Sequence, residues 1–274
     1  MLSHCDISAS FVEYLRRSPR HYAPATVSVR AAVVRRYLEA VADPFAVRVQ
    51  DVERWAADAR IGPSATRSLV SHVRAFYLWA IREGLTDRDP TVACELPTLP
   101  RRLPRPARDV SIAATIAASP PNVIAIVALM AGAGLRCCEV ARLRWVDVDM
   151  IAGTVYVTGK GGRDRVLEVA PAIRRSLAAI DHPGAFVFVN AQGEPFSACR
   201  ISQIVNGHLR ATGAGCTAHQ LRHRFATRSL AACRDLSVVR DLLGHASIQN
   251  TEIYAAVTPG IAGAVCRSID VPGL

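Results

Sequence analysis

The stretch Thr217–Tyr254, TAHQLRHRFATRSLAACRDLSVVRDLLGHASIQNTEIY, gathers three histidines, several arginines and a late tyrosine into three expected short helices. Thr217 and Gln220 form a capping box, which predicts the start of a helix. Residues three apart are neighbours on a helix surface, so His219 and Arg222 would share one face. That face would present an imidazole and a guanidinium together.

The rest of the stretch contains two further helix starts. Asp235 can cap a second helix, and Gly244 suits the left-handed residue that ends it, so His245 follows a helix terminus. Ser247 can cap a third helix that carries Tyr254 about 11 Å along the axis, at about 1.5 Å per residue. Taken singly, a histidine on a helix face or a tyrosine in a short helix is more commonly a packing residue.

Together these residues resemble the C-terminal half of the tyrosine recombinase (phage integrase) family. The family motif is H-x-x-R, then L-G-H, then a nucleophilic tyrosine nine residues after the second histidine; here the matching residues are His219, Arg222, Leu243-Gly244-His245 and Tyr254.

A second motif of that family, G-L-R-x-x-E, begins at Gly134. The resemblance makes Arg136 a catalytic arginine and Glu139 a supporting residue. Cys137-Cys138 departs from the usual small or aliphatic pair. Arg136 and Glu139 could also form a purely structural ion pair.

Lys160 is the only lysine among the 33 basic residues. It lies in TVYVTGKGGRDRVLEV, where two β-type segments, 154–158 and 165–169, flank three glycines and predict a β-hairpin with Lys160 near its tip. An ammonium can be tuned to donate a proton, whereas a guanidinium cannot. A solvated hairpin lysine is the alternative; the resemblance makes Lys160 the general acid.

Residues 1–96 predict a helical domain, with helices over 7–17, 26–41, 49–59 and 64–83. The domain resembles the family's core-binding (SAM-like) DNA-binding domain. Arginines that lie largely off the apolar stripes would contact DNA phosphates or simply be solvated. These candidates are Arg30, Arg35, Arg36, Arg67 and Arg74.

Residues 97–106, PTLPRRLPRP, predict a basic, proline-rich linker that contains Arg101, Arg102 and Arg105. In a polyproline conformation the linker would span roughly 28 Å at about 3.1 Å per residue. That length allows a two-domain clamp around DNA, although an ordinary basic spacer is equally compatible.

Residues 107–258 correspond to the catalytic domain, and the fold expected is mainly α with a small antiparallel β-sheet or hairpin. Besides the motifs, helices are expected over 109–118, 122–131, 171–180 and 197–211, with an apolar strand over 185–189. Arg224 stands where relatives more often have a small or hydroxylated residue, and would add a phosphate contact or nothing. The tail 259–274 would, by the resemblance, dock on a neighbouring protomer.

The composition fits a nucleic-acid partner without requiring one. The net charge is +10 and the pI about 9.7, with 13 basic against 11 acidic residues in 1–100 and 20 against 12 in 101–274. Eight cysteines without a C-x-x-C pair favour free thiols in a reducing compartment. No signal peptide or apolar run of about 20 residues is present, so we expect no membrane contact and a cytoplasmic, nucleoid-associated protein.

The resemblance implies a site-specific recombinase or integrase that cleaves and rejoins double-stranded DNA. Tyr254 would form a 3′-phosphotyrosyl intermediate, Arg136 and Arg222 would hold the phosphate, and His219 and His245 would share proton transfer and a phosphate contact, in an order left open. The chain shows no carboxylate cluster of the two-metal kind, so neither metal nor ATP is expected.

The expected assembly is a tetramer on two sites, with an accessory directionality factor as a further partner. Integration or excision of a phage or mobile element is the favoured role. A Xer-like chromosome or plasmid dimer resolvase, a type IB topoisomerase and a non-catalytic DNA-binding regulator are the alternatives.

Overall fold

The computed structural model describes residues 3–57, 61–99, 105–159, 164–181, 184–244 and 269–273. The chain divides into two compact units, Met1–Arg101 and Arg102–Leu274. This division falls within the segment that the sequence predicts as a linker. In the described part of the chain, no helix is long and apolar enough to cross a membrane.

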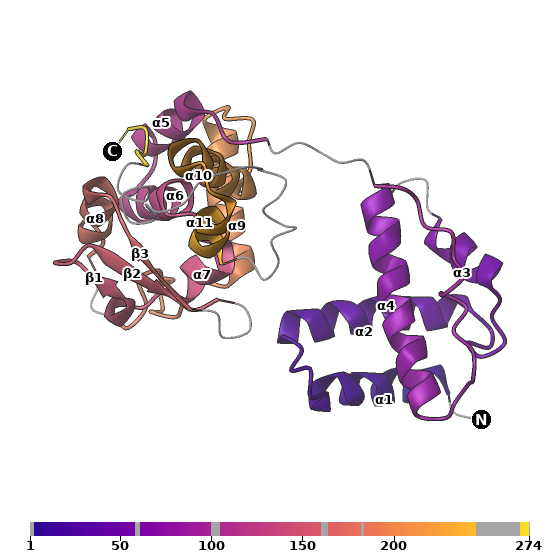
Figure 1. Cartoon of the computed structure of the whole chain (residues 1–274). Helices are drawn as coiled ribbons and strands as arrows, with labels where there is room; N and C mark the ends of the chain where they lie inside the picture. Colours follow the sequence, from indigo (N-terminus) through magenta and orange to yellow (C-terminus); the bar gives the residue numbers. More distant parts are fainter. Residues whose placement is uncertain are drawn as a thin grey trace. The chain divides into compact units, whose positions relative to one another are not determined.

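The described residues of the first unit form four helices (Figure 1). Their bounds are α1 His4–Arg17, α2 Pro24–Ala40, α3 Val49–Ala56 and α4 Pro63–Arg82. Each lies within three residues of an expected helix at both ends. Both α2 and α4 begin with a proline, whose fixed φ suits the first helical position and whose missing N–H would have no helical partner there.

Aromatic side chains hold the first unit together. Phe11 of α1 packs against Phe76 and Trp79 of α4, with ring centroids 5.7 and 5.4 Å apart. The buried hydroxyls of Tyr37 and Tyr77 are 2.7 Å apart, so the polar tips of these rings satisfy each other inside the core.

The second unit is mainly helical with one small sheet, as the sequence predicts (Figure 1). The three antiparallel strands are in the order β1-β2-β3, and Tyr156 lies opposite Val166 in the β2–β3 hairpin. The elements are α5 Asp109–Ala117, α6 Pro121–Gly132, α7 Cys137–Arg142, the 3-10 helix η1 Trp145–Asp147, β1 Val148–Asp149, β2 Thr154–Val157, β3 Arg165–Glu168, α8 Pro171–Ala178, α9 Ala198–Ala211, α10 Ala218–Cys233 and α11 Leu236–Leu243.

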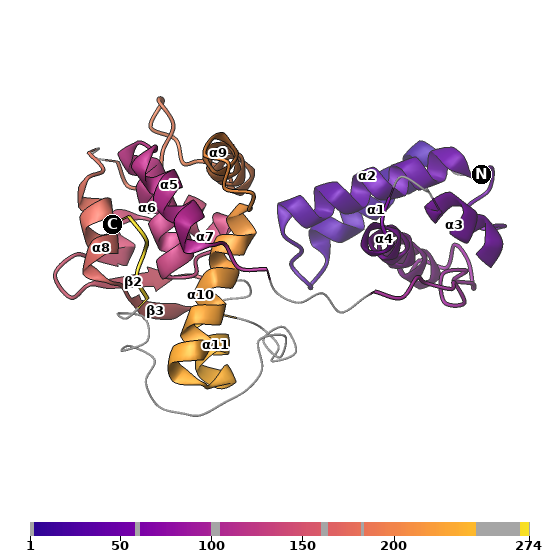
Figure 2. The same cartoon turned by 90° about the horizontal axis from the view of Figure 1, so that it is seen from above.

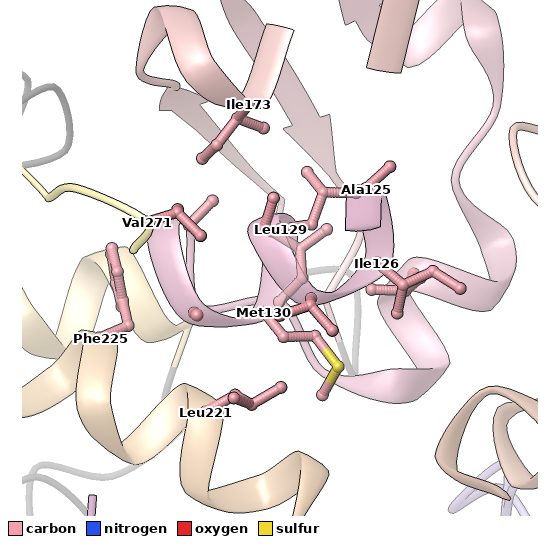
Figure 3. Close-up of a cluster of buried hydrophobic side chains, with 14 of the residues drawn as sticks. Ala125, Ile126, Leu129, Met130, Ile173, Leu221, Phe225 and Val271 are labelled. Carbon is pink, nitrogen blue, oxygen red and sulfur yellow. The ribbon is translucent and has the colours of Figure 1, made fainter. Parts of the chain in front are cut away.

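Helix α6 is the centre of this unit. Figure 3 shows its side chains between Ile173 of α8 and the pair Leu221 and Phe225 of α10, and every residue from Ala125 to Gly132 is buried. A helix that is apolar on all sides is typical of a core element. The apolar residues of α6 therefore form the centre of a globular domain.

The strand expected over 185–189 is wrong. Only single bridges form there, at Phe186 and Val189. The backbone of this segment bonds instead to the loop that follows α7, from Val187 N–H to the Leu143 carbonyl at 2.9 Å and from Trp145 N–H to the Ala185 carbonyl at 3.0 Å.

The described end of the tail lies against its own unit. Ile269 and Val271 are each 3% exposed and belong to the core around α6, where Val271 is labelled in Figure 3. A Cβ added at Gly132 would lie 2.6 Å from Val271 Cγ2. Residues 269–273 are thus docked within the chain, a contact that the sequence did not predict.

Gly134, in the turn between α6 and α7, should not tolerate a side chain. Its φ is +68°, and an added Cβ would lie 2.8 Å from Phe225 Cε1 and nearer still to Cδ1. We expect Gly134→Ala to lower the free energy of unfolding by on the order of 3 kcal/mol, combining left-handed strain with overpacking. Gly213→Ala is the control, since its φ is +64° but its Cβ would meet nothing within 4 Å. Urea unfolding of both variants checks this; equal losses would contradict it.

Candidate active site

Local capping builds the helices that carry the site. The Thr217 N–H donates to Gln220 Oε1 at 2.9 Å, which completes the expected capping box at the start of α10. Asp235 Oδ1 accepts the Ser237 N–H at 2.6 Å at the start of α11, and Gly244 ends that helix with a φ of +59°. The expected second helix start and stop of the opening stretch are therefore both present.

Glu139 is the centre of the site. It lies at the third position of α7, where its carboxylate accepts the Arg136 backbone N–H at 2.8 Å and Arg136 Nη1 at 2.7 Å. Arg165, the first residue of β3, donates Nη1 and Nη2 to the two carboxylate oxygens at 3.0 and 2.9 Å. Arg222 of α10 places Nη1 at 3.7 Å from Glu139 Oε2. Three guanidiniums therefore surround one carboxylate.

The arginines keep Glu139 ionised although it is 7% exposed. Burial would raise its pKa, but the hydrogen bonds and charge of Arg165, the Arg136 backbone N–H and the charge of Arg222 outweigh burial and lower the pKa to about 2. With three positive groups and one negative group, the four side chains carry a net charge of +2. Such a site favours a bound anion.

Main-chain carbonyls orient the two predicted phosphate-binding arginines. Arg222 donates Nη1 to the Gly134 carbonyl and Nη2 to the Leu243 carbonyl, the latter at 2.6 Å. Arg136 donates Nη2 to the Gly244 carbonyl at 3.4 Å. Both arginines therefore contact the end of α11, and Figures 1 and 2 show α11 beside α10.

His219 lies one turn before Arg222 on α10, as predicted. Its ring meets the ring of His223 edge-on, with centroids 4.4 Å apart. Desolvation and the positive charges of Arg222 and Arg136 hold the pKa of His219 below its usual value. Desolvation and the charges of His219 and Arg222 lower the pKa of His223 to about 4. Burial and the neighbouring guanidiniums therefore favour the neutral form of the His219 ring.

The structure brings Arg136, which directly precedes α7, and Glu139 of α7 together with His219 and Arg222 of α10. The three other predicted catalytic residues, Lys160, His245 and Tyr254, lie outside the described residues.

Arg165 was not predicted as a site residue. A signal was present, because alternation along β3 puts Arg165 on the same face as Leu167, which is 1% exposed. Because charged side chains are rarely buried without a partner, an arginine on the inward face of a strand predicts a buried carboxylate beside it, and Glu139 is that partner.

The predicted DNA-contacting arginines of the first unit lie on α2 and α4. Arg35, Arg36, Arg67 and Arg74 are exposed, whereas Arg30 is half-buried with its guanidinium 4.5 Å from the Tyr22 ring. Arg105 is exposed as well, and Arg101 and Arg102 lie outside the described residues. Exposure leaves these five side chains accessible to phosphates, so their DNA contacts stay a prediction.

Arg224 is not a surface residue, so the structure favours the alternative in which it adds no phosphate contact. The side chain is 2% exposed, with Nε 2.7 Å from Asp109 Oδ1 and Nη2 3.3 Å from Asp270 Oδ1. Its Nη1 also donates to the carbonyls of Ala131 and Asp270. Arg224 thus joins α10 to α5 and to the docked tail.

Comparison with known proteins shows which family this chain belongs to. The model of the phage integrase family matches residues 111–260, which include every motif described above. This chain belongs to the phage integrase family. It is a tyrosine recombinase, a site-specific enzyme of DNA strand exchange.

Relatives support the same assignment. The recombinase is 34% identical over 232 residues to tyrosine recombinase XerD of Xanthomonas axonopodis pv. citri, covering 76% of each chain. It is 38% identical over 214 residues to tyrosine recombinase XerC of Rhodospirillum centenum, covering 71% of this chain and 62% of the relative.

Solved structures share the fold of the recombinase. A lambda integrase(75-356) dimer bound to a COC' core site matches with a TM-score of 0.74 at 18% identity, over 90% of this chain and 93% of that one. The integrase of mycobacterium phage Brujita matches with a TM-score of 0.53 at 24% identity, over 97% of this chain and 93% of that one.

Glu139→Gln should destabilise the recombinase in a pH-dependent way. Because the folded-state pKa of Glu139 lies below its ordinary value of 4.5, the stabilisation from ionised Glu139 is full above that pH and is lost as pH falls toward 2. We expect the variant to lose on the order of 3 kcal/mol of unfolding free energy at pH 7, and this difference from the wild type to shrink below about pH 4.5. Denaturant unfolding at several pH values measures it; a difference that is constant with pH would contradict the assignment.

Proposed function

We propose that Tyr254 is the nucleophile of the recombinase and that Arg136 and Arg222 hold the scissile phosphate. The observation that carries this proposal is the cluster around Glu139, where the two guanidiniums are fixed by one carboxylate and three main-chain carbonyls. Planar guanidiniums with paired N–H donors match the nonbridging oxygens of a phosphodiester, which gather charge in the transition state.

The proposed step exchanges one phosphodiester for another. The Tyr254 hydroxyl loses its proton and its oxygen attacks the phosphorus, while the bond to the 5′-oxygen breaks. The product is a 3′-phosphotyrosyl enzyme and a free 5′-hydroxyl. Since the bond energy is retained in the phosphotyrosyl bond, the 5′-hydroxyl of another strand can reverse the step without ATP.

His219, Lys160 and His245 would complete the proton transfers. His219 is suited to take the proton from Tyr254, because its lowered pKa favours the neutral ring. Lys160 would protonate the leaving 5′-oxygen, and His245, directly after Gly244, would donate to a phosphate oxygen. We propose that no metal ion is needed, since guanidiniums supply the positive charge that a metal would otherwise provide.

In the proposed assembly, four copies act on two double-stranded DNA sites, and the two units of each chain clamp the duplex. A lambda integrase tetramer bound to a Holliday junction shares the fold of this chain, with a TM-score of 0.73. The basic balance of residues 101–274 supports DNA as the partner. Recombination would take place in the cytoplasm, at the nucleoid. An accessory directionality factor would be a further partner.

The favoured biological role is integration or excision of a phage or mobile element. A Xer-like role in resolving chromosome or plasmid dimers is the second candidate, and the 34% identity with a XerD recombinase supports it. Joining of two separate circles, as opposed to resolution of one dimeric circle, distinguishes the two roles. A type IB topoisomerase would relax supercoils without exchanging strands.

Tyr254→Phe should abolish the covalent DNA adduct and leave DNA binding intact. The phenyl ring keeps the shape of the side chain but lacks the attacking oxygen. The substrate is a nicked duplex selected for binding to the wild-type protein from a random-sequence pool. Denaturing gels after incubation detect the adduct, and gel shifts measure affinity.

Two controls sharpen this test. The wild-type protein should form the adduct at the same rate with and without EDTA, and the attached base maps the cleaved bond. An adduct that persists in Tyr254→Phe would assign the nucleophile elsewhere, and loss of the wild-type adduct in EDTA would show that a metal takes part.

Removal of residues 269–274 should affect assembly more than binding. We propose that the tail, which is docked within the chain here, exchanges onto a neighbouring protomer when the tetramer forms. Because the deletion also removes Ile269 and Val271 from the core, urea unfolding first checks that the truncated protein is folded. The folded truncated protein should bind one half-site within about threefold of the wild-type affinity but lose cooperative binding to a full site, as gel shifts at increasing protein concentration would measure. Unchanged cooperativity would refute the exchange.

A further inference from the structure

Arg165, the first residue of β3, contacts three parts of the site, although none of the sequence motifs includes it. Its side chain is 8% exposed, and its fork of two Nη groups matches the two oxygens of Glu139. Its Nε is buried and has no acceptor among the residues that the structure describes. The carboxylate of Glu139 is therefore the charged group that accounts for burial of this guanidinium.

Arg165 and Arg136 together fill the hydrogen-bond acceptor positions of the Glu139 carboxylate. Oε1 accepts from Arg136 Nη1 and Arg165 Nη1, while Oε2 accepts from the Arg136 N–H and Arg165 Nη2. A carboxylate has about four acceptor positions, so all are used. Arg222 Nη1 consequently stays 3.7 Å from Oε2, outside hydrogen-bond range.

Without Arg165, two acceptor positions of a buried carboxylate would be vacant. A buried carboxylate that loses a partner costs several kcal/mol, so the neighbouring guanidinium of Arg222 would be drawn onto it. That movement would turn the donors of Arg222 toward Glu139 and away from a bound phosphate.

Arg165 also supports the end of α11. A Cβ built at Gly244 would lie 2.8 Å from Arg165 Nη1 and 3.5 Å from its Cδ, so the arginine packs directly on this glycine. The Gly244 carbonyl in turn accepts from Arg136 Nη2. Gly244 immediately precedes His245, and β3 begins five residues after Lys160. One side chain thus links β3, α7 and the end of α11.

We propose that Arg165 is a positioning residue for strand cleavage. It occupies Glu139 and supports Gly244, and thereby holds Arg136 and Arg222 in the orientation that receives the phosphate. At 8% exposure it does not itself reach the substrate. This inference rests on the proposed phosphate-binding roles of Arg136 and Arg222.

The test compares Arg165→Gln, Glu139→Gln and the double variant on the nicked duplex selected with wild-type protein. At saturating protein, Arg165→Gln should slow covalent adduct formation on the order of 10²-fold, because small displacements of the clamping groups are costly, while half-site affinity changes less than about threefold. The double variant should be no slower than the slower single variant, since both changes act through one contact.

Arg174→Gln is the matched control. Arg174 of α8 is a half-buried arginine whose Nη1 donates to the Met150 carbonyl at 3.3 Å, and it contacts none of the site residues in the described part of the chain. It should leave the adduct rate unchanged. Arg165→Lys keeps the positive charge but loses the paired Nη groups, so it should retain part of the rate of adduct formation. It replaces Arg165→Gln in the test if that variant does not fold.

Three results would overturn the inference. Weaker half-site binding with an unchanged rate would make Arg165 a DNA contact, and multiplying rate losses in the double variant would make it independent of Glu139. Equal slowing by Arg165→Gln and Arg174→Gln would make the effect general destabilisation. Absence of any adduct with the wild-type protein would refute the proposed function instead.

Discussion

The second unit depends on burial of one carboxylate, Glu139, among three guanidiniums. Transfer of a carboxylate to the protein interior costs several kcal/mol unless charges and hydrogen bonds replace its water. Here two arginines and a backbone N–H supply these bonds, and a third guanidinium lies 3.7 Å away. The arrangement satisfies the carboxylate but carries more positive than negative charge among the described residues, which favours a bound anion.

The residues around Glu139 come from segments far apart in the sequence, and α6 determines how they meet. Since α6 is buried from Ala125 to Gly132, α8 and α10 pack on it, and the turn at Gly134 directs the chain from α6 into α7. The Gly134 carbonyl then accepts from Arg222. The same turn that closes the core thus orients one of the two arginines that we propose bind phosphate.

Local signals in the sequence predicted the helices well because helix ends are decided by nearby residues. The capping box at Thr217 and the left-handed Gly244 both involve neighbours within a few positions, and both are present. The strand predicted over 185–189 does not form, because the backbone there bonds to Leu143 and Trp145, about 40 residues earlier in the chain. Arg165 was missed for the same reason, since its carboxylate lies 26 residues earlier. The family motifs placed Arg136, His219 and Arg222 in one site, but no motif describes the contacts between them.

Two arginines of α10 show what distinguishes a binding site from a structural ion pair. Arg222 and Arg224 are two residues apart, so they point about 200° away from each other around the helix, and both are buried. On the Arg224 side, Asp109 and Asp270 face Arg224 and Arg228, two negative groups against two positive groups. That cluster is neutral and needs no ligand. On the Arg222 side, one carboxylate faces three guanidiniums. Arginines are buried on both sides, and the excess of positive charge distinguishes the Arg222 side as the one suited to an anion.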